Sequence, residues 1–83
     1  MKLLRMSAAD GDLLLAEGDP ALAEDEQRLV EEFRRQLELG MWAAVPAEGA
    51  AGRREATLVR DFSEVPREAE SVIFFPRAAG GAT

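Results

Sequence analysis

The most informative part of this sequence reads Ser71-Val72-Ile73-Phe74-Phe75-Pro76-Arg77-Ala78-Ala79-Gly80-Gly81. Its first residues are β-branched and aromatic, which favours a β-strand over 71–75. We expect Pro76 to end that strand, because proline has no N–H to donate to a neighbouring strand. Residues 77–83 have nothing large to bury and are predicted to form an exposed, flexible tail. The sequence therefore predicts a folded domain over 1–76 and a C-terminal tail over 77–83.

The predicted strand over 71–75 presents two faces. Successive side chains along a strand point to opposite sides of the sheet. One pair of apolar side chains should therefore enter the core beneath a helix. The other pair, which we assign to Ile73 and Phe75, is predicted to lie on the solvent-facing side as a partner-docking patch.

Upstream of that strand, an amphipathic helix is predicted over 20–39. Asp19 can cap it, and Pro20 suits its first position, where the missing N–H costs nothing. Gly40 offers a stop after its end. The apolar residues that recur at helical spacing form one stripe, namely Leu22, Leu29, Val30, Phe33 and Leu37.

Acidic residues gather on this predicted helix, and they raise the question of a metal or paired-carboxylate site. The group consists of Glu24, Asp25, Glu26, Glu31 and Glu32. Negative charge is favourable in the first turn of a helix, and the spacing predicts Glu24–Arg28 and Glu31–Arg35 ion pairs. We therefore interpret the acidic group as a solvated helix face.

The rest of the chain reads as short strands joined by turns. A hairpin is predicted around Asp10-Gly11, a strong tight-turn signal. Trp42 is expected in the core rather than at a ligand. The predicted strands are 2–6, 13–16, 41–45 (ending at Pro46) and 55–62, before the last one at 71–75. This order predicts an α+β fold of two layers, with the last strand inside the sheet beside the first.

The composition narrows the function classes. With 83 residues we expect one small domain with a thin core, which argues against an enzyme with a deep enclosed pocket. The sequence contains no cysteine and no histidine, which excludes disulfides, thiol nucleophiles, Cys/His zinc sites and serine-type triads. We expect no catalytic residue, no metal and no bound cofactor.

The charge balance bears on partners. Acidic residues outnumber basic ones by 16 to 10, for a net charge of −6. This field repels phosphate backbones and anionic membranes, so neither nucleic acid nor a membrane is an expected partner, and Arg53-Arg54 is too short to change this. No apolar run approaches the roughly 18 residues needed to span a bilayer. The lack of cysteine fits the reducing cytoplasm, where we expect the protein.

The end of the sequence, 71–81, together with the order of elements, resembles the ubiquitin-like β-grasp family. An apolar strand that runs into a Phe-Phe-Pro segment and a diglycine is similar to the end of MoaD-type sulfur carriers. It also resembles bacterial ubiquitin-like modifiers encoded beside their own activating, conjugating and deconjugating enzymes. The resemblance implies a β-grasp fold, with a mixed sheet of four to five strands and one amphipathic helix packed on one face.

Under this resemblance, the tail used for activation and conjugation consists of Arg77, Ala78, Ala79, Gly80 and Gly81. In MoaD-type carriers the second glycine is normally the last residue, whereas Ala82 and Thr83 follow here. That difference resembles ubiquitin-like precursors, whose short extension a peptidase removes. It implies a processing site between Gly81 and Ala82.

The function implied is that of a bacterial ubiquitin-like protein modifier that is not itself an enzyme. A separate adenylating enzyme would use ATP to activate the Gly81 carboxylate, a conjugating enzyme would attach it to target proteins, and a peptidase would process and deconjugate it. Lys2 is the only lysine, so lysine-linked polymers could grow only there. Two alternatives stay open. One is a MoaD-like sulfur carrier forming a C-terminal thiocarboxylate, and the other is a non-covalent β-grasp interaction domain.

Overall fold

The structure is a computed structural model and describes residues 1–7, 11–48 and 54–76. In these ranges the elements follow one another as β1 (Lys2–Ser7), β2 (Gly11–Glu17), α1 (Ala23–Glu38), β3 (Met41–Glu48), β4 (Arg54–Val59), a 3₁₀ helix η2 (Phe62–Glu64) and β5 (Ser71–Pro76). The predicted order of strands and helix is therefore confirmed. The predicted tail over 77–83 lies outside the described residues.

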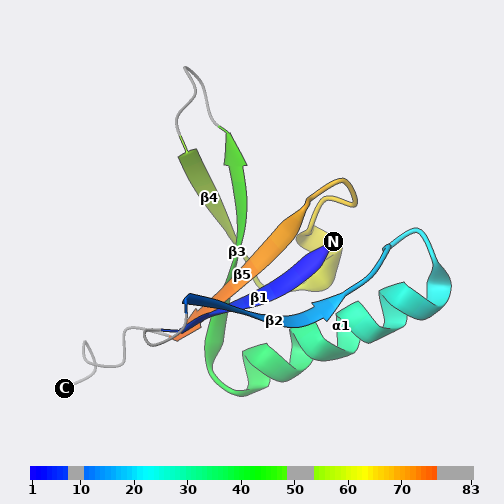
Figure 1. Ribbon diagram of the computed structural model, residues 1–83, viewed down its shortest axis with the longest axis horizontal. Helices are drawn as coiled ribbons and strands as arrows, with labels where there is room; N and C mark the ends of the chain where they lie inside the picture. The colour runs from blue at the N-terminus through cyan, green and yellow to red at the C-terminus, as the bar shows by residue number, and fades with distance from the viewer. Residues whose placement is uncertain (8–10, 49–53, 77–83) are drawn as a thin grey trace.

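The strands form one mixed five-stranded sheet in the order β2-β1-β5-β3-β4 (Figure 1). β5 runs parallel to β1 and antiparallel to β3, while the two outer pairs, β1–β2 and β3–β4, are antiparallel. The last strand thus lies at the centre of the sheet beside the first, as predicted. One helix on a mixed sheet with this strand order is the β-grasp arrangement, so the predicted fold class is confirmed.

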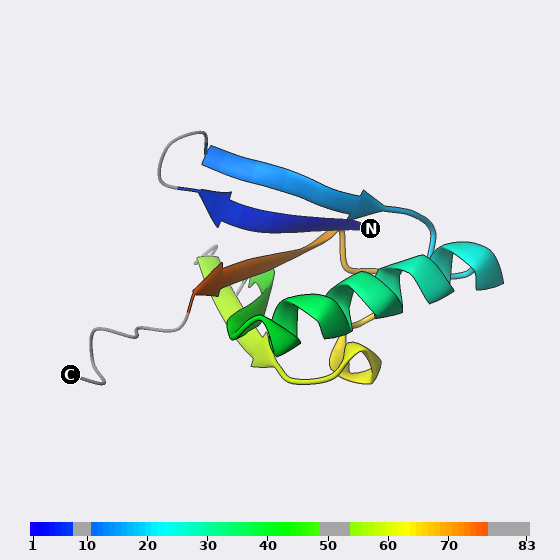
Figure 2. The same cartoon turned by 90° about the horizontal axis from the view of Figure 1, so that it is seen from below.

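A single layer of helix covers one face of the sheet (Figure 2). Phe33 of α1 packs edge-on against Phe74 of β5 and against Phe62 of η2, with ring centroids 5.4 Å and 5.8 Å apart. The fully buried side chains of this core are Leu3, Leu29, Phe33, Val72 and Phe74. The alternation predicted for β5 is therefore confirmed, because Val72 and Phe74 are its core-facing pair.

The helix begins later than predicted, at Ala23. Asp19 does not cap it, because its Oδ1 accepts a hydrogen bond from the Ala21 N–H at 2.9 Å and its carbonyl accepts one from the Leu22 N–H. These local bonds form a turn that holds Pro20 before the helix. Leu22 occupies the N-cap without a side-chain cap, and it is exposed rather than part of the apolar stripe.

The ion pairs of α1 also differ from the prediction. Arg28 binds Asp25, one turn away at 3.0 Å, and Glu26 binds Arg67 at 3.5 Å. Among the described residues these are the ion pairs present, so the predicted Glu24–Arg28 and Glu31–Arg35 pairs are wrong. Arg28 also donates to the Glu17 carbonyl at 3.1 Å, which draws its guanidinium toward β2 and Asp25.

Proline does not end the strands where the sequence suggested. β3 continues through Pro46 to Glu48, because its pairing with β5 stops at Ala44 and its pairing with β4 does not. β5 likewise includes Pro76, which lies across from Met41. A proline is tolerated where no ladder bond is required of its nitrogen.

Candidate functional site

The face of the sheet opposite α1 is the candidate site, and the strand register assigns residues to it. Ile73 of β5 lies beside Leu4 of β1 and across from Ala44 of β3. Phe75 lies across from Trp42. Residues paired across neighbouring strands share a face, and the alternate β5 residues Val72 and Phe74 fill the core. Ile73 and Phe75 therefore belong to the face that no helix covers, which we call the open face.

The open face is apolar across all the strands of the sheet. Its largest exposed side chains, with their exposed fractions, are Met6 (55%), Leu14 (55%), Leu58 (53%) and Trp42 (41%). Leu4, Ile73 and Phe75 are half-buried between them. Small residues complete it at Ala44, Pro46 and Ala56. Exposed apolar residues are normal singly, but a set gathered on one face of a sheet is a candidate interaction surface.

Trp42 is not in the core, so the prediction for it is wrong. Its neighbours Met41 and Ala43 point to the helix side and are buried, which leaves Trp42 on the open face. Its ring lies 6.1 Å from that of Phe75, tilted by 58°. Alternation places Trp42 and Ala43 on opposite faces, but only the structure shows that Ala43 is the one that faces the helix.

A shallow groove of about 350 Å³ crosses the open face where β3 and β4 leave the other strands. Figure 1 shows the far part of this strand pair projecting away from the sheet. The groove is lined by Met6, Ala44, Pro46, Ala56, Ile73 and Phe75, with Glu55 as its charged residue. Its lining includes both residues that the sequence assigned to a docking patch.

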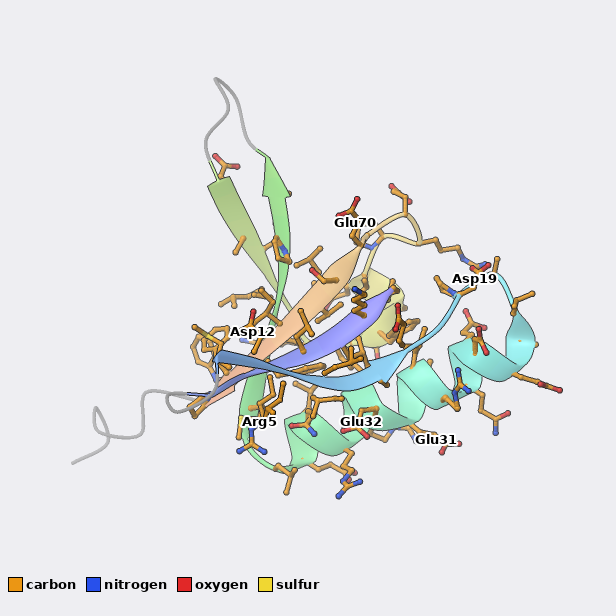
Figure 3. The ribbon with its side chains drawn as sticks, in the orientation of Figure 1. Arg5, Asp12, Asp19, Glu31, Glu32 and Glu70 are labelled. Carbon is orange, nitrogen blue, oxygen red and sulfur yellow. The ribbon has the colours of Figure 1, made fainter. Side chains whose placement is uncertain are left out.

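A larger groove of about 600 Å³ lies between the edge strand β2 and α1, and sequence reasoning missed it. Leu15 and Ala16 are partly buried in its lining. The charged residues that line it are Glu17, Arg28, Glu31, Glu32 and Arg35, and Figure 3 shows Glu31 and Glu32 on α1. Mixed charges on an open groove select no single ligand chemistry.

The carboxyl of Asp61 has a lowered pKa for a local reason. The pKa of the Asp61 carboxyl is lowered from its usual 3.8, chiefly because the Ser63 hydroxyl and then the Ser63 N–H donate to it. Glu64 accepts in return from the Asp61 N–H at 3.1 Å. This reciprocal cap stabilises the start of η2, so its role is structural. In the described part of the chain, no group of three or more Asp and Glu residues could hold a metal ion.

The tail residues predicted to carry activation, Arg77 to Gly81, and the processing site at Ala82 lie outside the described residues. Their nearest described neighbour is Pro76, at the end of β5 and across from Met41. The preceding residue, Phe75, lines the groove of the open face. The predicted docking patch lies on β5, and the diglycine segment follows β5 in the sequence.

Comparison of the chain with protein families, with curated protein sequences and with solved structures found no match. The described residues include no helix that is long and apolar enough to cross a membrane. Fold and surface therefore carry the functional argument.

Proposed function

We propose that this protein is a ubiquitin-like modifier whose Gly81 carboxylate, exposed by cleavage before Ala82, is adenylated by a separate enzyme and joined to target proteins. One observation carries the proposal. The diglycine Gly80-Gly81 follows shortly after β5, the central strand of a β-grasp sheet. β5 is bonded to β1 on one side and β3 on the other, so its end is a fixed point from which a short segment can be presented.

The chemistry proceeds on partner enzymes. The Gly81 carboxylate attacks the α-phosphorus of ATP, pyrophosphate leaves, and an acyl-adenylate forms. A thiolate then attacks the acyl carbon and AMP leaves. This thiolate belongs to a partner enzyme, since this chain has no cysteine. A target amine finally displaces the thiol and forms an amide. Glycine suits the reacting end because its backbone has no Cβ to obstruct a narrow channel.

The open face is the recognition surface in this proposal. The groove holding Ile73 and Phe75 lies on the same strand that leads to the diglycine. An enzyme that binds the groove would receive the segment at a set distance from its docking point. Tryptophan is enriched among the residues that dominate binding energy, and Trp42 is exposed on this face beside Phe75.

The test uses an N-terminally tagged full chain expressed in its native cells. We expect the tag to appear in higher-mass covalent adducts. The intact mass of the free protein should correspond to a chain that ends at Gly81. Gly81→Ala should abolish the adducts, while the same one-methyl change at Gly52 should leave them.

Three outcomes would argue against the modifier. A free protein heavier by the replacement of one oxygen with sulfur, without adducts, would assign it as a sulfur carrier. Adducts that survive Gly81→Ala would remove the diglycine from the chemistry. A chain that keeps its cellular function after loss of residues 80–83 would be a non-covalent interaction domain.

A further inference from the structure

The apolar area of the open face matches what a dimer of small subunits needs. The exposed parts of Met6, Leu14, Trp42 and Leu58, with their half-buried neighbours, present apolar surface on the order of 500 Å². A standard interface buries roughly 800 Å² per subunit, of which about 65% is apolar in homodimers. The face therefore holds about the apolar area of one homodimer half, at the upper limit of what monomers leave exposed.

Half of the net charge of the molecule lies away from this face. α1 has six acidic and three basic residues, so it carries −3 of the total −6, on the opposite side of the sheet. Among the described residues, the charged register positions of the open face are at strand ends, namely Lys2, Asp12 and Glu17 on β1 and β2 and Glu48 and Arg54 on β3 and β4 (Asp12 is labelled in Figure 3), and Glu55 lines the groove. Depletion of charge from the centre of a surface is typical of homodimer interfaces.

From this area and this charge distribution we propose that a second copy of the chain covers the open face, sheet against sheet. Stacked sheets lie about 10 Å apart, and each helix packs on the outer side of its own sheet. The two acidic helices would then be about 30 Å apart, several times the screening length of about 8 Å at physiological salt. Face-to-face pairing thus buries the apolar surface and keeps the like charges of two −6 molecules separated.

The pairing has a consequence for the proposed function, although it does not depend on it. Ile73 and Phe75 lie within the buried face, so the dimer conceals the surface that an activating enzyme would bind. Activation would then proceed from the monomer, and protein concentration would regulate it.

Sedimentation equilibrium of the purified full chain tests the pairing. We expect a mass of twice 9.0 kDa at high concentration that falls toward 9.0 kDa on dilution. Trp42 is the only tryptophan, so its fluorescence emission should shift to the blue over the same concentration range. Leu58→Glu places a charge in the interface and should weaken dimerisation by at least about tenfold.

Leu22→Glu is the matched control, because Leu22 is 56% exposed against 53% for Leu58 and lies at the N-terminus of α1. It should leave the dimer unchanged, and circular dichroism should show both variants folded. A chain that stays at 9.0 kDa at every concentration overturns the proposal. So does equal weakening by the two variants. A monomer whose Trp42 emission shifts only on adding the adenylating enzyme assigns the face to that enzyme, leaving the proposed function intact.

Discussion

Trp42 of β3 lies directly across from Phe75 of β5, and the two rings, 6.1 Å apart, are on the open face rather than in the core. The residue next to Phe75 has the opposite environment, because Phe74 is 0% exposed and contacts Phe33 beneath the helix. Two adjacent phenylalanines thus serve different purposes. Phe74 holds the helix to the sheet, and Phe75 forms part of a surface.

Replacing each phenylalanine with alanine should have different effects on stability. Phe74→Ala should lower the free energy of unfolding by about 3–5 kcal/mol, because it removes a fully buried ring and leaves a cavity. Phe75→Ala should lower it by less than half as much, because its ring is half-buried. Urea denaturation of both variants measures the difference. Equal losses would contradict the assignment of faces.

Gln36 should be replaceable with a gain in stability. It is 3% exposed, its Nε2 donates to Glu32 Oε2 at 2.6 Å, and its Oε1 has no partner in the described structure. Gln36→Met removes the unpaired oxygen and should raise the free energy of unfolding by about 1 kcal/mol. The exposed Gln27→Met should change it by less than about 0.5 kcal/mol. A net loss for Gln36→Met would contradict this, because it would show that the hydrogen bond to Glu32 contributes more than the unpaired oxygen costs.

The Asp61 cap of η2 should make the folded chain less stable in acid. The pKa of Asp61 is lower in the folded chain than its usual 3.8, so the folded state favours the ionised carboxylate. Its contribution is therefore present above that usual value and is lost as pH falls through the lowered folded pKa. The melting temperature of Asp61→Asn should lie below that of the natural chain near neutral pH, and the gap should close in acid. A gap independent of pH would rule out this titration as its source.

The single lysine makes a prediction that rests on the proposed function. Lys2 lies on β1 and is exposed, and it is the only side-chain amine in the sequence. Lys2→Arg should therefore abolish lysine-linked polymers of the modifier while leaving single attachment to targets unchanged. Mass spectrometry of purified conjugates can detect the branch at Lys2. Polymers that persist in the variant would require attachment through another group.

Local chemistry explains the parts of the fold that were predicted correctly. The apolar stripe that includes Leu29 and Phe33 indicated the helix, and Gly40, with a φ of 91°, ends it as expected. The β-branched and aromatic run of β5 indicated a strand in the sheet interior. These features depend on spacing and on backbone conformation within a few residues, which is the information that a sequence presents directly.

Boundaries and partners were predicted less well, because each depends on competition between several possible partners, some near and some distant in the sequence. Asp19 looked like a cap, but its carboxylate is used in the preceding turn. Pro46 looked like a strand end, but β4 keeps β3 extended beyond it. Arg28 was expected to bind Glu24, yet the Glu17 carbonyl of β2 and Asp25 hold it instead. In each case the decisive partner was fixed by folding.

By itself, the sequence determined an acidic chain without cysteine or histidine, one amphipathic helix, and a strongly apolar last strand followed by a diglycine. Tertiary structure alone decided that β3 is the second neighbour of this strand, and that Trp42, Leu14, Leu58 and Phe75 meet on one uncovered face. The reason is that alternation assigns side chains to two faces but does not say which face the helix covers. That choice depends on how the strands are ordered and how Phe33 packs on Phe74.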